Sequence, residues 1–376
     1  TGVEPSESLP AGGRMVEGVG AGFSEDTEIL FGETPVAVAK VLSPTRATVQ
    51  VPPGEAGPVA LTARTGKHAH AGTAEFGYAA HPYLFYTAET VPEIREKFND
   101  PFYAAYKRTI LAGGNAGAAV VDGKDFSKNL YPLIGAWVCT GEDKYRDKAL
   151  ELVDVIIARL DKISYGQFSM MGTFHVALAY DALFADLSQE QRHGLQQYLR
   201  RSIKAHMQGM PQHNNDDQGR SIPEETWFYT NISNTNAVGN GGAGMACLAL
   251  RNSSAMARTD LQYAIEQIRK YAEHCIQPDG ANIEGSFYAG YGQRHYFRFA
   301  EALAHANGDT QLLDMPNLEQ HQNYYKAMLA GNGRMYMYSD AYPHFPSSVT
   351  FASLARHYDQ DFMRWMAKHH GHKGFY

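Results

Sequence analysis

The hydrophobic pattern of this chain changes its period once, near residue 80. Before that point, short β-type runs recur at 28–31, 36–39, 47–51 and 59–63. After about residue 88, apolar residues recur at the three- and four-residue spacing of amphipathic helices. Because strand and helix place side chains with different periods, one kind of element cannot explain both halves. The sequence therefore predicts a multidomain chain, with a β domain over residues 1–80 and a helical domain over residues 81–376.

Turn signals rich in proline and glycine separate the β-type runs, at 32–35, 43–45, 52–54 and 57–58. Proline cannot donate to a strand ladder, and both residues are typical of tight turns. Short strands at this rhythm predict a small antiparallel β-sandwich.

The second region carries several amphipathic stripes. One runs from Leu150 to Leu160, and the cleanest runs from Leu261 to Ile276. Pro278 and Gly280 then end that helix. The segment 188–191 has the spacing of a capping box. Helices joined by modest loops, without a strand pattern between them, fit either a solenoid or a closed α/α toroid.

Charge and composition exclude some functions. The net charge of −7 argues against a nucleic-acid binder, although a local arginine cluster can still bind an anion. No apolar run is long enough to span a membrane. The chain begins at Thr1 without a hydrophobic targeting segment, which fits either a mature exported protein, secreted or periplasmic, or a trimmed chain.

Three cysteines, Cys139, Cys247 and Cys275, lie far apart in apolar helical contexts. We expect them to be buried free thiols, with one disulfide as the alternative. Their spacing is not that of a metal site, and we expect neither a metal nor a cofactor. The sequence does not predict an oligomeric state.

A tyrosine- and arginine-rich segment at 278–298 follows the cleanest helix. If a new helix begins near Tyr291, then Arg294, His295 and Arg298 share its face. Ionising a tyrosine at pH 7 costs roughly 4 kcal/mol, and a nearby guanidinium in a dehydrated cleft offsets part of that cost. This face therefore predicts a phenolic base beside cations that can bind a carboxylate. Tyr288 is the second candidate for the base.

Each of these residues also has a purely structural interpretation. Tyr291 can be a packed aromatic residue. His295 is a candidate general acid, and its structural alternative is a core or cleft-wall histidine. Arg298 can form an ordinary surface pair with Glu301. Glu284 can line the cleft or cap the loop.

The segment 231–242 combines asparagines and glycines at the entrance of an apolar helix. Asn234, Asn236 and Asn240 are poor helix-interior residues, and the glycines among them are worse. One interpretation is amide side chains directed into a cavity, with Asn236 and Asn240 on one helix face. The other is asparagine caps combined with glycine-mediated helix packing.

Residues 5–79 resemble an IPT/TIG immunoglobulin-like domain. The resemblance is carried by the segments 20–24, 29–32, 42–45 and 51–54. It implies a module that acts as a spacer or a packing partner, without chemistry of its own.

Residues 82–350 resemble the helical domain of heparinase II/III-like and alginate-lyase-like polysaccharide lyases. The similar segments, in family order, are 81–87, 140–145, 177–181, 234–242 and 284–292. The resemblance implies an incomplete α/α toroid that cleaves a uronic-acid-containing glycan, a glycosaminoglycan or alginate, by β-elimination. The partner is then an acidic polysaccharide.

The same resemblance implies roles for single residues. Tyr291, or Tyr288, would be base and acid; Asn236 would neutralise the uronate carboxylate, and Arg294 would assist. Apart from the resemblance, their residue types and positions make five further residues candidates for contacts with the rest of the substrate: Asn234, Asn240, Glu284, Arg298 and His344.

Two features of this chain depart from the family pattern. Many such lyases place a histidine in the asparagine-rich motif, where this chain has Thr235 and Ala237; His344 is a candidate for the missing imidazole. Family members usually carry a large β-sandwich after the toroid, and this chain stops at Tyr376, which fits a fragment or a divergent form.

Two other functions remain open from the sequence. A glycoside hydrolase on the same scaffold needs two carboxyl groups across the cleft, for which Glu284 and Asp340 are candidates. A non-catalytic glycan-binding protein would need no such pair.

Overall fold

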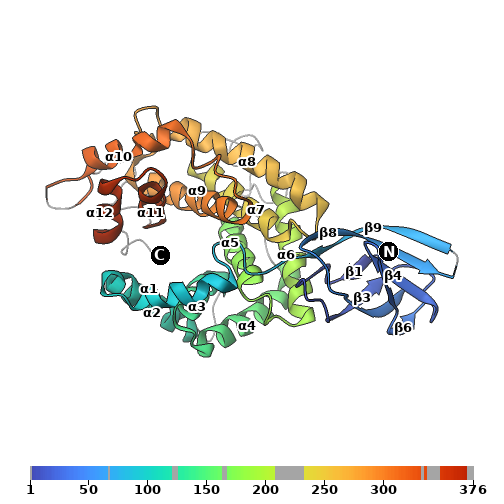
Figure 1. The fold of residues 1–376 in the computed structure, drawn as a ribbon. Coiled ribbons are helices and arrows are strands. Elements are labelled where there is room, and N and C mark those ends of the chain that lie inside the picture. Colours follow the sequence, from blue (N-terminus) through green and yellow to red (C-terminus); the bar gives the residue numbers. More distant parts are fainter. Residues whose placement is uncertain are drawn as a thin grey trace.

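The computed structural model describes residues 2–66, 68–120, 126–162, 167–207, 233–331, 334–336 and 348–370. A β-rich domain lies at one end, and helices curve around an opening at the other (Figure 1). This arrangement confirms the predicted fold class, a small β-sandwich followed by a mainly helical region.

The β domain is built from two sheets. The first sheet orders its strands β1 (Gly2–Glu4), β3 (Met15–Val19), β7 (Arg46–Gln50) and β6 (Lys40–Ser43). The second orders them β2 (Glu7–Ser8), β9 (His68–Tyr78), β8 (Gly57–Thr65), β4 (Thr27–Phe31) and β5 (Thr34–Ala37). Strand residues alternate between buried and exposed, and the buried side chains of both sheets, including Val16, Ile29, Val49, Leu61 and Phe76, form one core.

The four predicted runs correspond to β4, β5, β7 and β8. The expectation of a purely antiparallel sandwich was wrong, because β2 pairs parallel with β9, with Glu7 opposite Gly77. Two residues of β2 carry no readable period, so the direction of this pairing could not be predicted.

The described part of the helical region contains three short 3₁₀ helices, η1 (Ala88–Thr90), η2 (Pro101–Tyr103) and η3 (Leu160–Lys162). Its α-helices are α1 (Val91–Asn99), α2 (Ala104–Ala118), α3 (Phe126–Thr140), α4 (Asp143–Ile157), α5 (Gln167–Ala182), α6 (Gln189–Met207), α7 (Asn234–Leu250), α8 (Ala255–Cys275), α9 (Gly285–Asn307), α10 (Pro316–Met328), α11 (Ser348–His357) and α12 (Asp361–His369). No helix in these described segments is long and apolar enough to cross a membrane.

Alternate helices pack in two concentric layers. Helices α3, α5, α7, α9 and α11 contact one another in succession, as do α2, α4, α6, α8 and α10. The first set surrounds the opening in Figure 1. The Tyr106 hydroxyl of α2 donates to the Ala367 carbonyl of α12, so the two ends of the arc touch. Of the two architectures left open by the sequence, this closure favours a toroid over a solenoid.

Helix α7 is the centre of the helical core. Every residue from Asn236 to Leu250 is buried, and the helix contacts α5, α6, α8 and α9. An added Cβ at Gly242 would lie 2.4 Å from the Met170 carbonyl oxygen, and one at Gly244 would lie 2.4 Å from the Phe299 ring. The glycines therefore permit close helix packing, as the structural interpretation expects. The expected asparagine cap is not found, because the N-cap residue of α7 is Ser233.

Several local predictions can be compared with the helices. The capping box at α6 is confirmed, because Ser188 and Gln191 exchange side-chain and backbone hydrogen bonds. Helix α8 ends at Cys275 as predicted. Helix α9 begins at Gly285, earlier than the predicted start near Tyr291. Its first turns bury Ser286 and Ala289, and this burial outweighs the low helix propensity of the glycines.

All three cysteines are free, as expected, although Cys139 is only half-buried.

A buried polar network joins the β domain to α5. Glu7 of β2 accepts a hydrogen bond from the Tyr180 hydroxyl at 2.6 Å, and its Oε1 lies 3.4 Å from His81 Nε2. His81 Nδ1 lies 2.7 Å from Asp181 Oδ1. Burial alone would lower the pKa of His81, but Asp181 and Glu7 raise it to about 9. The β domain is thus anchored to the same helix that contributes to the candidate site below.

Candidate functional site

The predicted cationic face of α9 exists. The Arg294 guanidinium lies over the Tyr291 ring, 5.5 Å from its centroid. The rings of Tyr291 and His295 meet edge to face at 5.4 Å. Arg298 follows one turn after Arg294, so all four side chains occupy one side of the helix.

Helices α3 and α5 supply the opposite wall. The Tyr291 hydroxyl donates to Met171 Sδ at 3.1 Å. Arg298 lies over two aromatic rings, 4.7 Å from Tyr131 of α3 and 4.8 Å from Phe174 of α5. His175 follows Met171 by one helical turn, and its ring lies 6.0 Å from that of Tyr131. Segments far apart in sequence thus converge on one face of α9.

Sequence analysis missed this wall. Met171, Phe174 and His175 lie within a nearly uniform apolar stretch of α5 whose polar positions carry no recognisable motif. The only local signal is the spacing of Met171 and His175, which places both on one helix face. That spacing does not identify which helix the face meets.

Cations dominate the electrostatics of the site. Burial, Arg298, Arg294 and Lys128 lower the pKa of His175 to about 3. Burial and the same two arginines hold the pKa of His295 well below its usual value. Burial and Arg298 lower the pKa of Arg294 to about 10. At neutral pH the two imidazoles are therefore neutral and the guanidiniums charged.

The Tyr291 hydroxyl is half-buried, and burial raises its pKa above the ordinary value. Arg294 acts in the opposite direction by favouring the phenolate, but burial outweighs it. A guanidinium therefore lowers the Tyr291 pKa as predicted, but its effect on this pKa is smaller than that of burial. Tyr288, one turn earlier, is also half-buried and contacts the Phe287 ring at 5.2 Å.

The amides of α7 are engaged within the helix packing. Asn236 is 1% exposed and donates to the Gln267 carbonyl at 3.0 Å. Asn240 donates to the Asn236 side chain at 3.2 Å and lies 2.9 Å from His206 Nε2. A substrate contact of Asn236 would require these hydrogen bonds to be exchanged.

Glu284 joins the N-termini of α7 and α9. Its Oε1 accepts hydrogen bonds from the Asn234 backbone N–H at 2.7 Å and from Asn234 Nδ2 at 2.8 Å. Burial raises the pKa of Glu284, and the Asn234 hydrogen bonds partly counter that shift. His344 and Asp340 lie outside the described residues.

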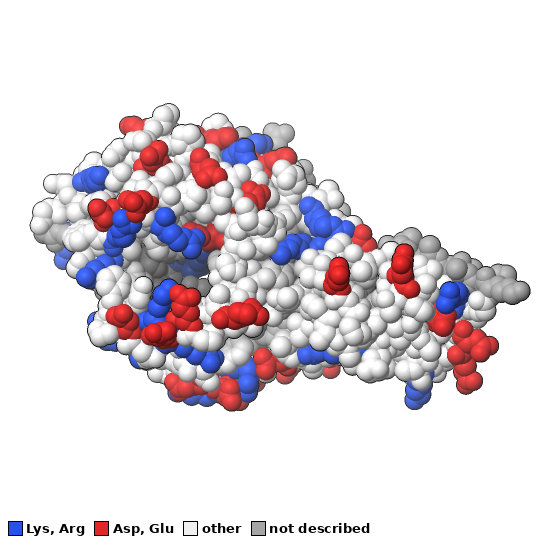
Figure 2. Space-filling model, in the orientation of Figure 1, with Lys and Arg blue, Asp and Glu red and all other residues white. Residues whose placement is uncertain are grey.

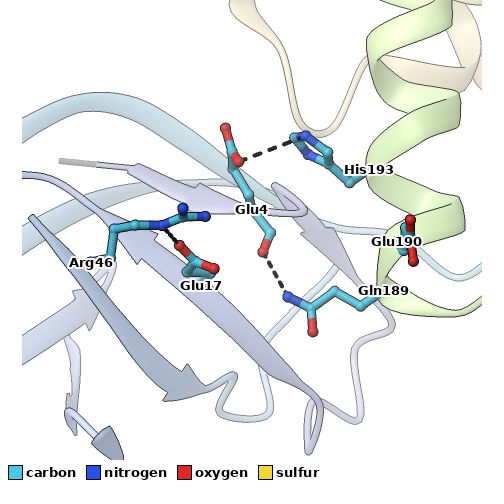
Figure 3. Close-up of a pocket in the computed structure, with 6 residues that line it drawn as sticks. All are labelled: Glu4, Glu17, Arg46, Gln189, Glu190 and His193. Atoms are coloured by element: carbon cyan, nitrogen blue, oxygen red, sulfur yellow. Dashed lines mark hydrogen bonds and ion pairs between the residues drawn. The ribbon is translucent and has the colours of Figure 1, made fainter. Parts of the chain in front are cut away.

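A separate pocket of about 320 Å³ lies between the β domain and α6 (Figure 3). Gln189 donates to the Glu4 carbonyl at 3.2 Å, and His193 lies 3.7 Å from the Glu4 carboxylate. Its lining residues are Glu4, Glu17, Arg46, Gln189, Glu190 and His193. Three carboxylates make this pocket unsuited to an acidic glycan, and none of the α9 candidates lines it.

The surface of the helical region is hollowed between its two arms, and both basic and acidic side chains lie around this hollow (Figure 2). Within the described segments, no three His, Cys, Asp or Glu side chains cluster as metal ligands would.

Comparison with known proteins identifies the first domain. Residues 1–78 match the IPT/TIG domain family, which confirms that resemblance. None of the curated proteins matches the sequence. Among solved structures, the chain is similar to a polysaccharide lyase, with 11% identity and a TM-score of 0.34 over 97% of this chain. This chain spans 56% of that structure's chain.

Proposed function

We propose that the protein is a polysaccharide lyase of the heparinase II/III-like or alginate-lyase-like type, acting on a uronic-acid-containing glycan by β-elimination. One observation carries the proposal. Tyr291 shares a face with Arg294, and the only acceptor of its hydroxyl among the described residues is a thioether sulfur. Sulfur is a weak acceptor, so a substrate can replace this hydrogen bond at little cost.

The chemistry follows from these groups. Arg294 holds the uronate carboxylate and acidifies the proton on the adjacent C5. The Tyr291 phenolate takes that proton, the C5 electrons form a C4–C5 double bond, and the C4–O4 bond breaks. The tyrosine then returns a proton to the leaving O4 oxygen, so no water is consumed.

A hydrolase is less well supported. Two carboxyl groups on opposite sides of a sugar would be needed, one of them ionised. The groups that shift the pKa values of His175, Arg294 and His295 include no carboxylate. Glu284 is engaged with Asn234.

The substrate class also suggests where the protein works. A polymeric acidic glycan does not cross a membrane unaided, so an enzyme that cleaves it internally would be exported, secreted or periplasmic. Retention of the protein in the cytoplasm of its native cell would contradict this part of the proposal.

The test is a screen of the purified chain against acidic polysaccharides, monitored by the ultraviolet absorbance of unsaturated sugar ends. We expect Tyr291→Phe to lower kcat by roughly 100-fold or more, since general acid–base groups contribute about that much. Tyr288→Phe removes a neighbouring hydroxyl on the same helix and tests the second candidate for the base; it should retain most of the activity if Tyr291 is the base. Full activity of a variant that carries both Tyr288→Phe and Tyr291→Phe would refute the proposal, as would products that gain water without unsaturation.

A further inference from the structure

Two aromatic rings hold the Arg298 guanidinium in place. The rings of Tyr131 and Phe174 lie 4.7 and 4.8 Å from its guanidinium carbon. No carboxylate or carbonyl of the described residues accepts a hydrogen bond from it. Aromatic rings engage the face of a guanidinium, whereas its donors lie in the plane. The in-plane fork that matches an acidic group is therefore available.

A second unsatisfied group lies beside Arg298. His175 Nδ1 is buried and has no hydrogen-bond partner among the described residues. A buried polar atom without a partner is uncommon and costs stability, so such an atom often indicates a function. Because His175 is neutral, it adds no further charge repulsion beside the arginines, and a neutral imidazole can donate one N–H.

The position of Arg298 separates it from the reaction centre. A uronate carboxylate is attached directly to the carbon that loses its proton, so its cation must lie beside Tyr291, as Arg294 does. Arg298 is seven residues from Tyr291, a rise of about 10.5 Å along the helix. An acidic group that reaches Arg298 therefore belongs to a different sugar from the one that is deprotonated.

We propose that Arg298 and His175 form a second acidic-group subsite, so that the preferred glycan carries acidic groups on neighbouring sugars. This inference rests on the proposed function, because the first acidic group is the uronate at Arg294. The aromatic rings of Tyr131 and Phe174 orient the guanidinium fork, and His175 contributes a neutral donor.

The experiment measures glycan affinity by calorimetry in a Tyr291→Phe background, which prevents turnover. The probes are a homopolyuronate hexasaccharide, an unsulfated hexasaccharide that alternates uronate with N-acetylhexosamine, and the sulfated form of the latter. Arg298→Gln removes the fork. Arg364→Gln is the matched control, because it removes the same charge from an exposed arginine that forms ion pairs with Asp359 and Asp361.

We expect Arg298→Gln to weaken binding of the homopolyuronate roughly 10- to 100-fold, the range for a hydrogen bond to a charged group. Binding of the unsulfated alternating chain should be unchanged. Dependence on Arg298 for the sulfated chain alone would support a sulfate as the second acidic group. Equal weakening for all three probes, or none, would overturn the subsite.

A second substitution separates His175 from a purely structural role. His175→Gln keeps a neutral N–H donor and should retain most of the affinity for the homopolyuronate, whereas His175→Leu should lose it. Thermal unfolding of each variant checks that the fold is intact. Equal affinity of folded His175→Leu and wild type would remove His175 from the subsite.

The same measurements distinguish this inference from the proposed function. If the wild type forms no unsaturated ends but the Arg298-dependent preference persists, the lyase assignment fails and the subsite stands. If unsaturated ends form while affinity is independent of Arg298, the subsite alone fails.

Discussion

Tyr291 lies where two effects on its ionisation oppose each other. Burial raises its pKa and Arg294 lowers it, with burial the larger effect. A tyrosine that acts as a base must be deprotonated, so its activity is limited by the small phenolate fraction at neutral pH. In the proposed mechanism, Arg294 would therefore have two roles: it would bind the carboxylate and would favour the phenolate form of Tyr291.

This balance gives a pH prediction. Below the Tyr291 pKa, the phenolate fraction grows about tenfold per pH unit, so kcat/KM should rise through the alkaline range. Arg294→Gln removes the group that lowers this pKa, so its rate at any given pH should fall roughly tenfold or more. Initial rates of unsaturated-end formation from pH 7 to 9, below the Arg294 pKa of about 10, provide the measurement. A rate that falls with rising pH in this range would contradict a tyrosine base.

Glu284 offers a test of how the two helix N-termini are held. Its raised pKa means that its contribution to stability is present at low pH and is lost as the pH rises through the folded-state pKa. Glu284→Gln keeps an acceptor for Asn234 without the charge and should be at least as stable as wild type at pH 7. Glu284→Ala leaves buried donors unpaired and should lose about 1–3 kcal/mol. Urea unfolding compares the two variants, and equal loss in both would show that the charge itself is needed.

At the scale of elements, the close packing of α7 explains a glycine-rich helix that propensity alone disfavours. Its glycines face the neighbouring helices: Gly242 faces α5, Gly239 faces α6, and Gly241 and Gly244 face α9. Helix propensity costs about 1 kcal/mol per glycine, and the buried contacts of this helix outweigh that cost.

We therefore predict opposite effects for two Gly→Ala changes in helices. Gly242→Ala places a methyl group 2.4 Å from the Met170 carbonyl oxygen and should cost about 1–3 kcal/mol of stability by overpacking. Gly135→Ala in α3 meets nothing within 4 Å and should gain roughly 0.5–1 kcal/mol from helix propensity. Thermal or urea unfolding measures both. If Gly242→Ala leaves the free energy of unfolding unchanged, the contact between α7 and α5 can adjust to the added methyl group at little cost.

What could be predicted from the sequence depended on whether the signal was local. The strand runs, the Ser188–Gln191 capping box and the end of α8 are set by neighbouring residues, and all were predicted. The prediction for the start of α9 was wrong, because the burial of Ser286 and Ala289 depends on tertiary packing. The α5 wall was missed for the same reason, because His175 meets the arginines of α9 only after folding.

At the scale of the molecule, α5 connects the β domain to the candidate site in the helical domain. Its Met171 and His175 face α9, and its Tyr180 and Asp181 hold the buried Glu7 and His81. The IPT/TIG domain therefore acts as a packing partner of the helix that carries one wall of the site. Loosening this junction should disturb the site from a distance, since the affected helix is continuous.

The buried junction predicts a stability that depends on pH. The pKa of His81 is about 9 in the folded protein, above the ordinary value of 6.5, so its contribution is fully present below pH 6.5 and is lost as the pH rises through 9. This shift in the His81 pKa corresponds to about 3 kcal/mol in the free energy of unfolding, because one pKa unit is about 1.4 kcal/mol. His81→Gln cannot carry the charge, leaves Glu7 and Asp181 without their cation, and should lose about 3–5 kcal/mol at pH 6. The wild-type advantage over His81→Gln, measured by urea unfolding at pH 6, 7.5 and 9.5, should shrink with rising pH. An advantage that stays constant or grows would mean that His81 is neutral in the folded protein and that the junction is held by hydrogen bonds alone.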